Sequence, residues 1–260
     1  MSAGLEAFAQ RLADKTRHHP MVIHLNPIGL FRLGHNNRTR LAAFDAFLSC
    51  VEASGGQLFI PTYSYSYTAN KPYDVLHTRS SLDAVSEYVR QQHAPQRTYD
   101  PLFSYVQFGD FLAHKHYTIR DHNSFGAGSL LEAVFEADGY IGSLGHTLGF
   151  WTEVHYIEHQ LRMPYRQDKC FSGTTKMPDN NPVPSQTTFY CRDHSFNLGV
   201  DLSRMAKDLM REGKIYIWKN EGVDFQFEVI KFKALFQFLQ GKLQADPMYL
   251  CIGRDQIRSY

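Results

Sequence analysis

The chain has 260 residues, of which 43% are hydrophobic and 20% charged, enough apolar material for one large domain or two small ones. Lysines and arginines number 27 against 26 aspartates and glutamates, so the composition excludes a disordered chain and gives no basic field for nucleic acid. The sequence has no apolar run of about 18 residues that would span a membrane. Its four scattered cysteines are typical of reduced thiols. We therefore expect a cytoplasmic protein without a nucleic-acid or membrane partner.

The first half of the chain alternates helix and strand signals, which is typical of a sheet covered by helices. Amphipathic or capped segments predict helices over residues 1–17, 41–53, 80–91, 129–138 and 152–161. Short apolar runs predict strands over residues 21–24, 58–60 and within 139–145. Ser80 or Ser81 is expected to cap the third helix, and Thr152 the last. The expected fold class is α/β, a layered α/β/α sandwich around a central mixed sheet.

The second half changes character after Tyr165, where three prolines interrupt short β-rich segments such as 188–191. Helices are predicted over 202–212 and 233–240, and a strand pair over 214–219 and 225–230. We expect an α/β core over residues 1–165. Residues 166–260 are then a smaller β-rich subdomain and C-terminal α/β elements packed on that core.

The predicted helix 152–161 carries the pattern T-x-x-H-x-x-E, formed by Thr152, His155 and Glu158. Steps of three residues place these side chains on one helix face. Histidine can accept a proton from an amine near neutral pH, so His155 is a candidate general base. Glu158 could fix the imidazole tautomer or hold an ammonium group. Thr152 could donate a hydrogen bond to an oxyanion or simply cap the helix.

Two other interpretations of this helix remain open at the level of sequence. His155 and His159 also fit the pattern H-x-x-E-H of inverted zincins, in which two histidines one turn apart bind zinc. That peptidase alternative needs a third ligand later in the chain. A non-catalytic binding protein, with packed histidines and core aromatics, is the other alternative.

Several segments occur in the order found in the antibiotic N-acetyltransferase family, which includes the aminoglycoside 3-N-acetyltransferases. The sequence resembles the family at residues 55–64, 79–83, 85–90, 97–104 and 124–129, and at the Thr152, His155 and Glu158 pattern. The resemblance spans roughly residues 20–165. It implies an acyl-CoA-dependent N-acyltransferase that acylates the amine of an amino sugar, with coenzyme A as co-substrate and no metal.

The resemblance also implies roles for individual residues. His155 is the base, Glu158 its supporting carboxylate and Thr152 a neighbour of the reacting thioester. In the family, coenzyme A lies near the loop after the first strand. In this sequence, His24, Leu25 and Asn26 replace the small hydroxyl residues that are usual there. The expected coenzyme A contacts are His24, Asn26, Arg32, Arg38 and Ser104. Solvated arginines and a capping serine are the structural alternatives for this set.

The acceptor is expected to contact Tyr63, Ser64, Tyr65, Arg97 and Tyr99. Core packing of the tyrosines and a structural ion pair at Arg97 are the alternatives. Near-zero net charge with many aromatics favours a nucleotide-linked amino sugar for surface polysaccharide synthesis over a polycationic drug. An aminoglycoside 3-N-acetyltransferase that confers antibiotic resistance is the alternative. The sequence leaves open the acyl group, acetyl or hydroxyacyl, and a homodimer.

Overall fold

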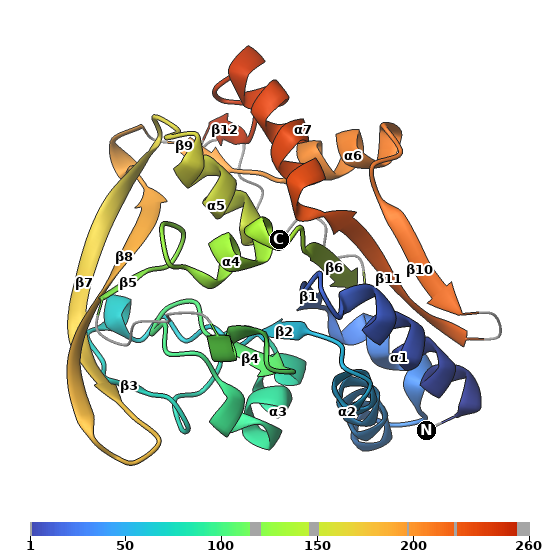
Figure 1. Ribbon diagram of the computed structural model, residues 1–260. Coiled ribbons are helices and arrows are strands. Elements are labelled where there is room, and N and C mark those ends of the chain that lie inside the picture. The colour runs from blue at the N-terminus through green and yellow to red at the C-terminus, as the bar shows by residue number, and fades with distance from the viewer. Residues whose placement is uncertain (1, 115–120, 146–150, 197, 221–222, 254–260) are drawn as a thin grey trace.

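The computed structural model describes residues 2–114, 121–145, 151–196, 198–220 and 223–253 (Figure 1). Its α-helices are α1 (Ala3–Thr16), α2 (Asn37–Ala53), α3 (Ala84–Gln92), α4 (Leu130–Glu136), α5 (Glu153–Gln160), α6 (Ser203–Arg211) and α7 (Phe232–Ala245). The strands of the main sheet are β1 (Met21–Leu25), β2 (Leu58–Pro61), β4 (Tyr105–Phe108), β6 (Tyr140–Leu144), β10 (Tyr216–Asn220) and β11 (Val223–Lys231). Smaller sheets contain β3 (Tyr73–Asp74), β5 (Asp121–Asn123), β7 (Arg166–Lys176), β8 (Pro182–Arg192), β9 (Leu198–Val200) and β12 (Cys251–Gly253).

The main sheet has six strands in the order β10-β11-β6-β1-β2-β4. Strand β1 lies parallel to β2 and to β6, while β11 runs antiparallel to β6, and β4 antiparallel to β2. The sheet is therefore mixed. This confirms the expected α/β class and places the carboxyl ends of β1, β2 and β6 at one edge.

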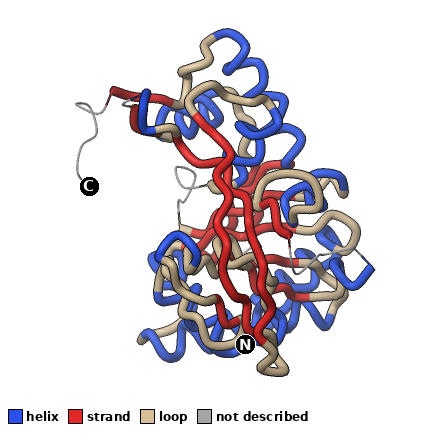
Figure 2. The backbone as a smooth tube through the Cα atoms, turned by 90° about the vertical axis from the view of Figure 1, so that its left-hand side faces the viewer, coloured by secondary structure: helices blue, strands red, loops and turns tan. Residues whose placement is uncertain are grey.

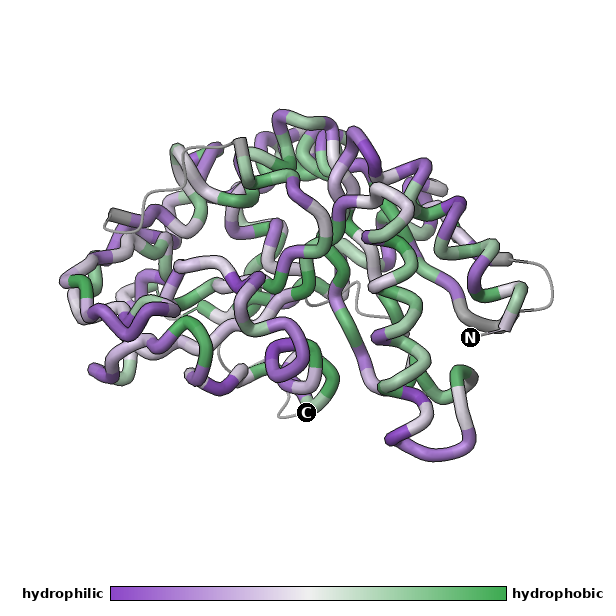
Figure 3. Tube along the Cα trace, turned by 60° about the horizontal axis from the view of Figure 1, so that its bottom comes forward, coloured by the Kyte–Doolittle hydropathy of each residue, from purple (hydrophilic) through white to green (hydrophobic). Residues whose placement is uncertain are grey.

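Alternating side chains of the central strands face two separate hydrophobic clusters. In β1, Met21 and Ile23 pack in the cluster formed with α1 and α2, whereas Val22 belongs to the cluster formed with α4, α5 and α7. Figure 1 shows these two groups of helices on opposite sides of the sheet. In Figure 3 the hydrophobic residues gather along the inner segments and the outer turns are mostly hydrophilic. The sheet is covered on both faces, as the sequence predicts.

A second sheet stands beside the first and has the strand order β3-β7-β8-β5. Its centre is the antiparallel pair β7 and β8, in register from Arg166 opposite Arg192 to Lys176 opposite Pro182. Figure 2 shows this long pair running down the face of the molecule. Tyr190 of β8 belongs to the same hydrophobic cluster as Val22 of β1, so the second half packs on the first. The domain boundary at residue 165 stays a prediction.

Helix starts differ from the sequence prediction in two places. Helix α3 begins at Ala84 and is capped by Asp83, whose Oδ1 accepts hydrogen bonds from the backbone N–H groups of Val85 and Ser86. The expected caps Ser80 and Ser81 are therefore wrong, because the carboxylate satisfies two donors of the first turn. Thr152 precedes α5 but its side chain makes no capping hydrogen bond. None of the described helices combines the length and apolar character that crossing a bilayer requires.

Candidate active site

The predicted chemistry lies at the edge of the main sheet where three parallel strands end. Strand β1 ends at Leu25, β2 at Pro61 and β6 at Leu144. In open α/β sheets, ligands bind beyond such carboxyl ends. Helix α5 follows β6 in the chain, and Thr152, which precedes the helix, lines a pocket together with Leu25 and Pro61 at this edge.

His155 and Glu158 form a hydrogen-bonded pair on α5. Nδ1 of His155 lies 2.8 Å from Oε2 of Glu158, as the spacing of three residues on a helix predicts. Glu158 is completely buried, while 25% of the His155 side chain is exposed. Because a carboxylate only accepts hydrogen bonds, Nδ1 carries the proton and Nε2 is left as the basic nitrogen.

Arg166, the first residue of β7, and Tyr165, the residue before it, hold the Glu158 carboxylate in place. The hydroxyl of Tyr165 donates a hydrogen bond of 2.9 Å to Oε1. Nε of Arg166 lies 2.7 Å from Oε2 without the alignment of a hydrogen bond, so this contact is an ion pair. Both carboxylate oxygens are thus engaged, which fixes the carboxylate and, through it, the ring of His155.

The charges of this cluster favour a neutral imidazole. Burial lowers the pKa of His155 below its ordinary value of 6.5, and the Arg166 guanidinium lowers it further, against the opposing effect of Glu158. Burial alone would raise the pKa of Glu158, but Arg166 and His155 together bring it below its ordinary value. Near pH 7 the pair therefore consists of a carboxylate and an unprotonated imidazole.

A pocket of about 410 Å³ opens at His155. Its other walls come from the β7–β8 pair and the segment that follows it, and the lining residues are His155, Arg166, Phe189, Cys191, Arg192, His194 and Val200. Sequence analysis predicted only His155 of this set as a site residue and missed the other six. Strand alternation shows that Phe189 and Cys191 share a face, but it does not show that this face meets α5.

A second pocket of about 440 Å³ is lined by Thr152, the residue that precedes α5, and by residues at the ends of β1 and β2. It contains four predicted site residues, His24, Asn26, Tyr63 and Tyr65, together with Thr152. Tyr65 has a φ of 52°, which residues other than glycine rarely adopt and which is often found at functional sites. The structure thus brings Tyr63 and Tyr65 to the predicted coenzyme A residues, and places them away from the pocket at His155.

The other predicted site residues lie elsewhere. Arg97 is 3% exposed and donates hydrogen bonds to the hydroxyl groups of Thr62 and Ser104 and to three backbone carbonyl groups. Ser104 is fully buried and donates to the carbonyl oxygen of Thr62. Their polar groups are thus used within the fold, through hydrogen bonds and not through the ion pair or the helix cap considered as alternatives. Ser64 donates to the carbonyl oxygen of Pro101.

Tyr99 borders a separate groove with Arg97, outside both pockets at α5. Arg38 is exposed in the first turn of α2. The side chain of Arg32 lies outside the described part of the structure. Contacts from these three residues to a ligand stay predictions.

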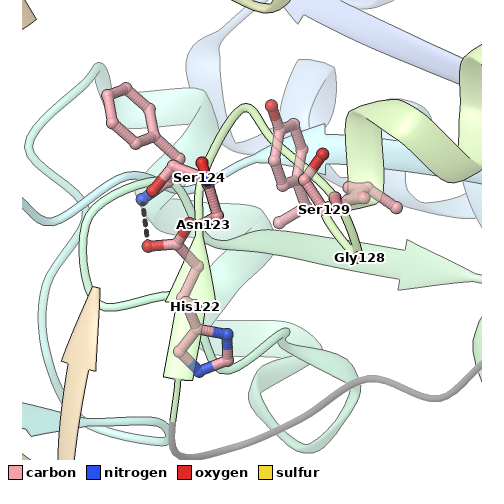
Figure 4. A pocket seen from close by; sticks show the side chains of 10 residues that line it. His122, Asn123, Ser124, Gly128 and Ser129 are labelled. Atoms are coloured by element: carbon pink, nitrogen blue, oxygen red, sulfur yellow. Dashed lines mark hydrogen bonds between the residues drawn. The ribbon is translucent and has the colours of Figure 1, made fainter. Parts of the chain in front are cut away.

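The family-like segment 124–129 encloses a third, much smaller pocket of about 30 Å³. Figure 4 shows His122, Asn123 and Ser124 on one side of it, with Gly128 and Ser129 at the start of α4 on the other. This volume corresponds to about one water molecule. The pocket is too small for a substrate.

The zinc alternative is not matched by the side chains of α5. The ring of His159 lies edge-on to Tyr190 with 5.1 Å between the ring centroids, and its Nε2 is 3.7 Å from Oδ1 of Asp168. Within the described ranges, no group of three histidine, cysteine, aspartate or glutamate side chains is placed to hold a metal ion. His155 is instead bound to Glu158.

Comparison with known proteins agrees with this geometry. The model of the aminoglycoside 3-N-acetyltransferase family matches residues 29–244, most of the chain. The chain belongs to the aminoglycoside 3-N-acetyltransferase family. It is therefore a member of a family of acyl-CoA-dependent N-acetyltransferases, which displaces the peptidase and the non-catalytic alternatives.

Similar solved structures share the fold of the family at low sequence identity. The apoenzyme of aminoglycoside acetyltransferase AAC(3)-IVa has a TM-score of 0.64 and 17% identity, over 94% of this chain and 90% of that one. AAC-IIIb in its binary complex with coenzyme A has a TM-score of 0.65 and 16% identity, over 94% and 97%. YokD from Bacillus subtilis has a TM-score of 0.64 and 14% identity, over 93% of both chains. No curated protein sequence matches the chain.

Proposed function

We propose that this protein transfers an acyl group from acyl-CoA to the amine of an amino sugar, with His155 as general base. The observation that carries the proposal is the His155–Glu158 pair, whose Nδ1 to Oε2 distance is 2.8 Å, at the wall of a pocket. A base oriented in this way takes a proton from the amine as its nitrogen attacks the thioester carbon. Glu158 then stabilises the imidazolium that forms.

We assign the acyl-CoA to the pocket with His24, Asn26 and Thr152. Two observations support this assignment: the pocket lies at the end of β1, and two of the five expected coenzyme A contacts, His24 and Asn26, line it. Leu25, Pro27, Pro61 and Leu82 give the pocket an apolar wall that suits a pantetheine arm. Thr152 is one helical turn before His155, so a thioester beside Thr152 is close to the base. Its hydroxyl makes no capping hydrogen bond but contacts the side chain of Tyr63, and it could turn to donate to the developing oxyanion.

The amine substrate then occupies the pocket at His155. Two relatives have been crystallised with aminoglycosides, an AAC(3)-IVa variant with apramycin and AAC-VIa with sisomicin. Family membership and these complexes make an aminoglycoside the first acceptor to test. Acetylation of such a drug would confer antibiotic resistance.

A specific feature of the pocket favours a second acceptor, a nucleotide-linked amino sugar. Arg166, Arg192 and His194 line the pocket, and no aspartate or glutamate is among its lining residues. A polycationic drug is expected to meet carboxylates in its site, whereas a diphosphate is bound by arginines. This observation supports the preference derived from the near-neutral composition.

One matrix of substrates tests the function and the acceptor class together. Acetyl-CoA and a hydroxyacyl-CoA are combined with apramycin, sisomicin, and a dTDP- and a UDP-linked amino sugar, and release of free thiol is recorded. We expect turnover with an amino sugar, and faster turnover with the nucleotide-linked compounds if the arginines bind the acceptor. Efficient acylation of aminoglycosides alone would refute the role of the arginines. If no pair releases thiol, the proposed function fails.

The pH dependence of the enzymatic activity should show the lowered pKa of His155. Only the unprotonated imidazole accepts the amine proton, so activity falls when His155 is protonated. Burial and Arg166 lower this pKa below 6.5, so the acidic limb should lie below pH 6.5. The measurement is kcat/KM for acyl-CoA against pH at saturating amine. An acidic limb centred at or above the ordinary value would contradict the neutral resting state.

A further inference from the structure

His24 lines the pocket assigned to acyl-CoA and forms, with Glu153 behind it, a buried pair of ionisable side chains that the mechanism above does not use. His24 stands near the end of β1 and is 7% exposed, and Glu153 in the first turn of α5 is completely buried. Nε2 of His24 lies 2.8 Å from Oε2 of Glu153 and 3.1 Å from Oε1. The carboxylate therefore accepts the Nε2 proton and leaves Nδ1 as the second ring nitrogen.

Among the described residues that line this pocket, His24 is the one whose side chain can carry a positive charge. The other titratable groups that line it are the phenols of Tyr63 and Tyr65 and the carboxyl group of Asp83. Tyr63 donates its hydrogen bond to the hydroxyl of Tyr105. Burial raises the pKa of Tyr63 well above its ordinary value, and Glu153 raises it further, so this phenol stays neutral. Proton donation to a substrate in this pocket thus depends on His24.

The reaction produces a negative charge in this pocket. When the tetrahedral intermediate collapses, the carbon–sulfur bond breaks and its electron pair goes to the sulfur of coenzyme A. A thiolate in a partly apolar pocket is unfavourable unless a cation or a proton donor is close. A histidine paired with a buried carboxylate can hold the proton that this sulfur needs.

We propose that His24, held by Glu153, is the general acid that protonates the leaving thiol of coenzyme A. The proposal rests on the proposed function and adds a second catalytic histidine to it. The amine nitrogen bonds to the carbonyl carbon while His155 takes the amine proton at Nε2. The carbon–sulfur bond then breaks, and the Nδ1 proton of the His24 imidazolium moves to sulfur. The products are the amide and free thiol, and solvent returns one proton to His24 and removes one from His155.

A comparison of leaving groups separates this role from a structural one. We expect His24→Gln to lower kcat/KM for acetyl-CoA by about 100-fold, the low end for general acid–base catalysis. With S-(4-nitrophenyl) thioacetate, whose thiol has a low pKa, departure needs little proton transfer and the loss should be below about 10-fold. A purely structural role of His24 would lower both rates by the same factor, and that result would overturn the proposal.

Two further variants guard against effects on folding. The double variant His24→Gln/Glu153→Gln removes both members of the pair, so no buried carboxylate is left without a partner. It should show the same difference between the two thioesters. His93→Gln is the matched control, because His93 forms another partly buried pair, with its Nε2 2.7 Å from Oδ1 of Asp45, and lines none of the three pockets around the site. It should leave both rates unchanged.

A binding measurement tests the same charge without turnover. In the complex with free coenzyme A, the ultraviolet absorbance of the thiolate is titrated against pH. A His24 imidazolium beside sulfur should lower the pKa of the bound thiol relative to free coenzyme A, and the double variant should abolish that shift. Equal pKa values of the bound thiol in the parent protein and the double variant would overturn the proposal. This measurement decides the question even if the aryl thioester reacts too slowly for its rates to be compared. If full activity persists in His155→Gln, the role of His155 as general base fails instead.

Discussion

Replacing His155 with glutamine should lower kcat by at least about 100-fold, the low end of what a general base contributes. Glutamine keeps a similar size but cannot accept the amine proton near pH 7. The exposed quarter of the side chain indicates that the effect is on chemistry more than on folding. The measurement is free-thiol release at saturating acyl-CoA and amine, with thermal unfolding to confirm a folded variant.

His159→Gln is the control for this substitution. His159 lies one turn further along α5, and 15% of its side chain is exposed, so it tests a histidine of the same helix outside the pair with Glu158. Acyl transfer should stay near the parent rate. A loss in His159→Gln equal to that in His155→Gln would instead favour two histidines acting as metal ligands.

Replacing Arg166 with methionine should lower the free energy of unfolding by about 3–5 kcal/mol, the usual cost of leaving one member of a buried ion pair without its partner. The side chains of Arg166 and Glu158 are only 3% and 0% exposed. Glu158 would keep its contacts with His155 and Tyr165 but lose the one full positive charge beside it. Urea unfolding at neutral pH measures the difference.

Arg162→Met provides the matched comparison. Arg162 pairs with Asp168 at 2.9 Å, but these side chains are 59% and 39% exposed, so the pair should contribute less than about 1 kcal/mol. Equal losses in the two arginine variants would show that burial does not set the strength of the Arg166 pair. Unfolding of Arg166→Met at pH 4 should be closer to the parent than at pH 7, since a protonated Glu158 needs no cation.

Much of the fold can be predicted from the sequence because its signals are local. The apolar runs at 21–24 and 58–60 predict buried strands, and the spacing in 152–161 predicts the helix that carries His155. The order and direction of the strands then predict which residues lie close together. Parallel strands end at one edge, so residues after β1 and β2 meet α5 there. The grouping of His24, Asn26 and Thr152 around one pocket follows from this topology.

The wall of the pocket at His155 could not be predicted in the same way. Phe189 and Arg192 belong to β8, which pairs with β7, and the sequence of β7 shows no clear apolar alternation. Whether residues of β8 line a pocket together with His155 of α5 depends on the tertiary fold. The same limit applies to Arg97 and Ser104. Their residue types suit a binding site equally well, and only their burial shows that the polar groups serve the fold. Sequence patterns identify a chemical group without showing what surrounds it.

The two pockets beside α5 share no lining residue. Under the proposed assignment, the thioester and the amine would therefore be bound at the same time, in a ternary complex. The acyl group would then pass directly from one substrate to the other, and no acyl-enzyme intermediate would have to form. Either substrate could also bind first, because neither would occupy the lining residues of the other.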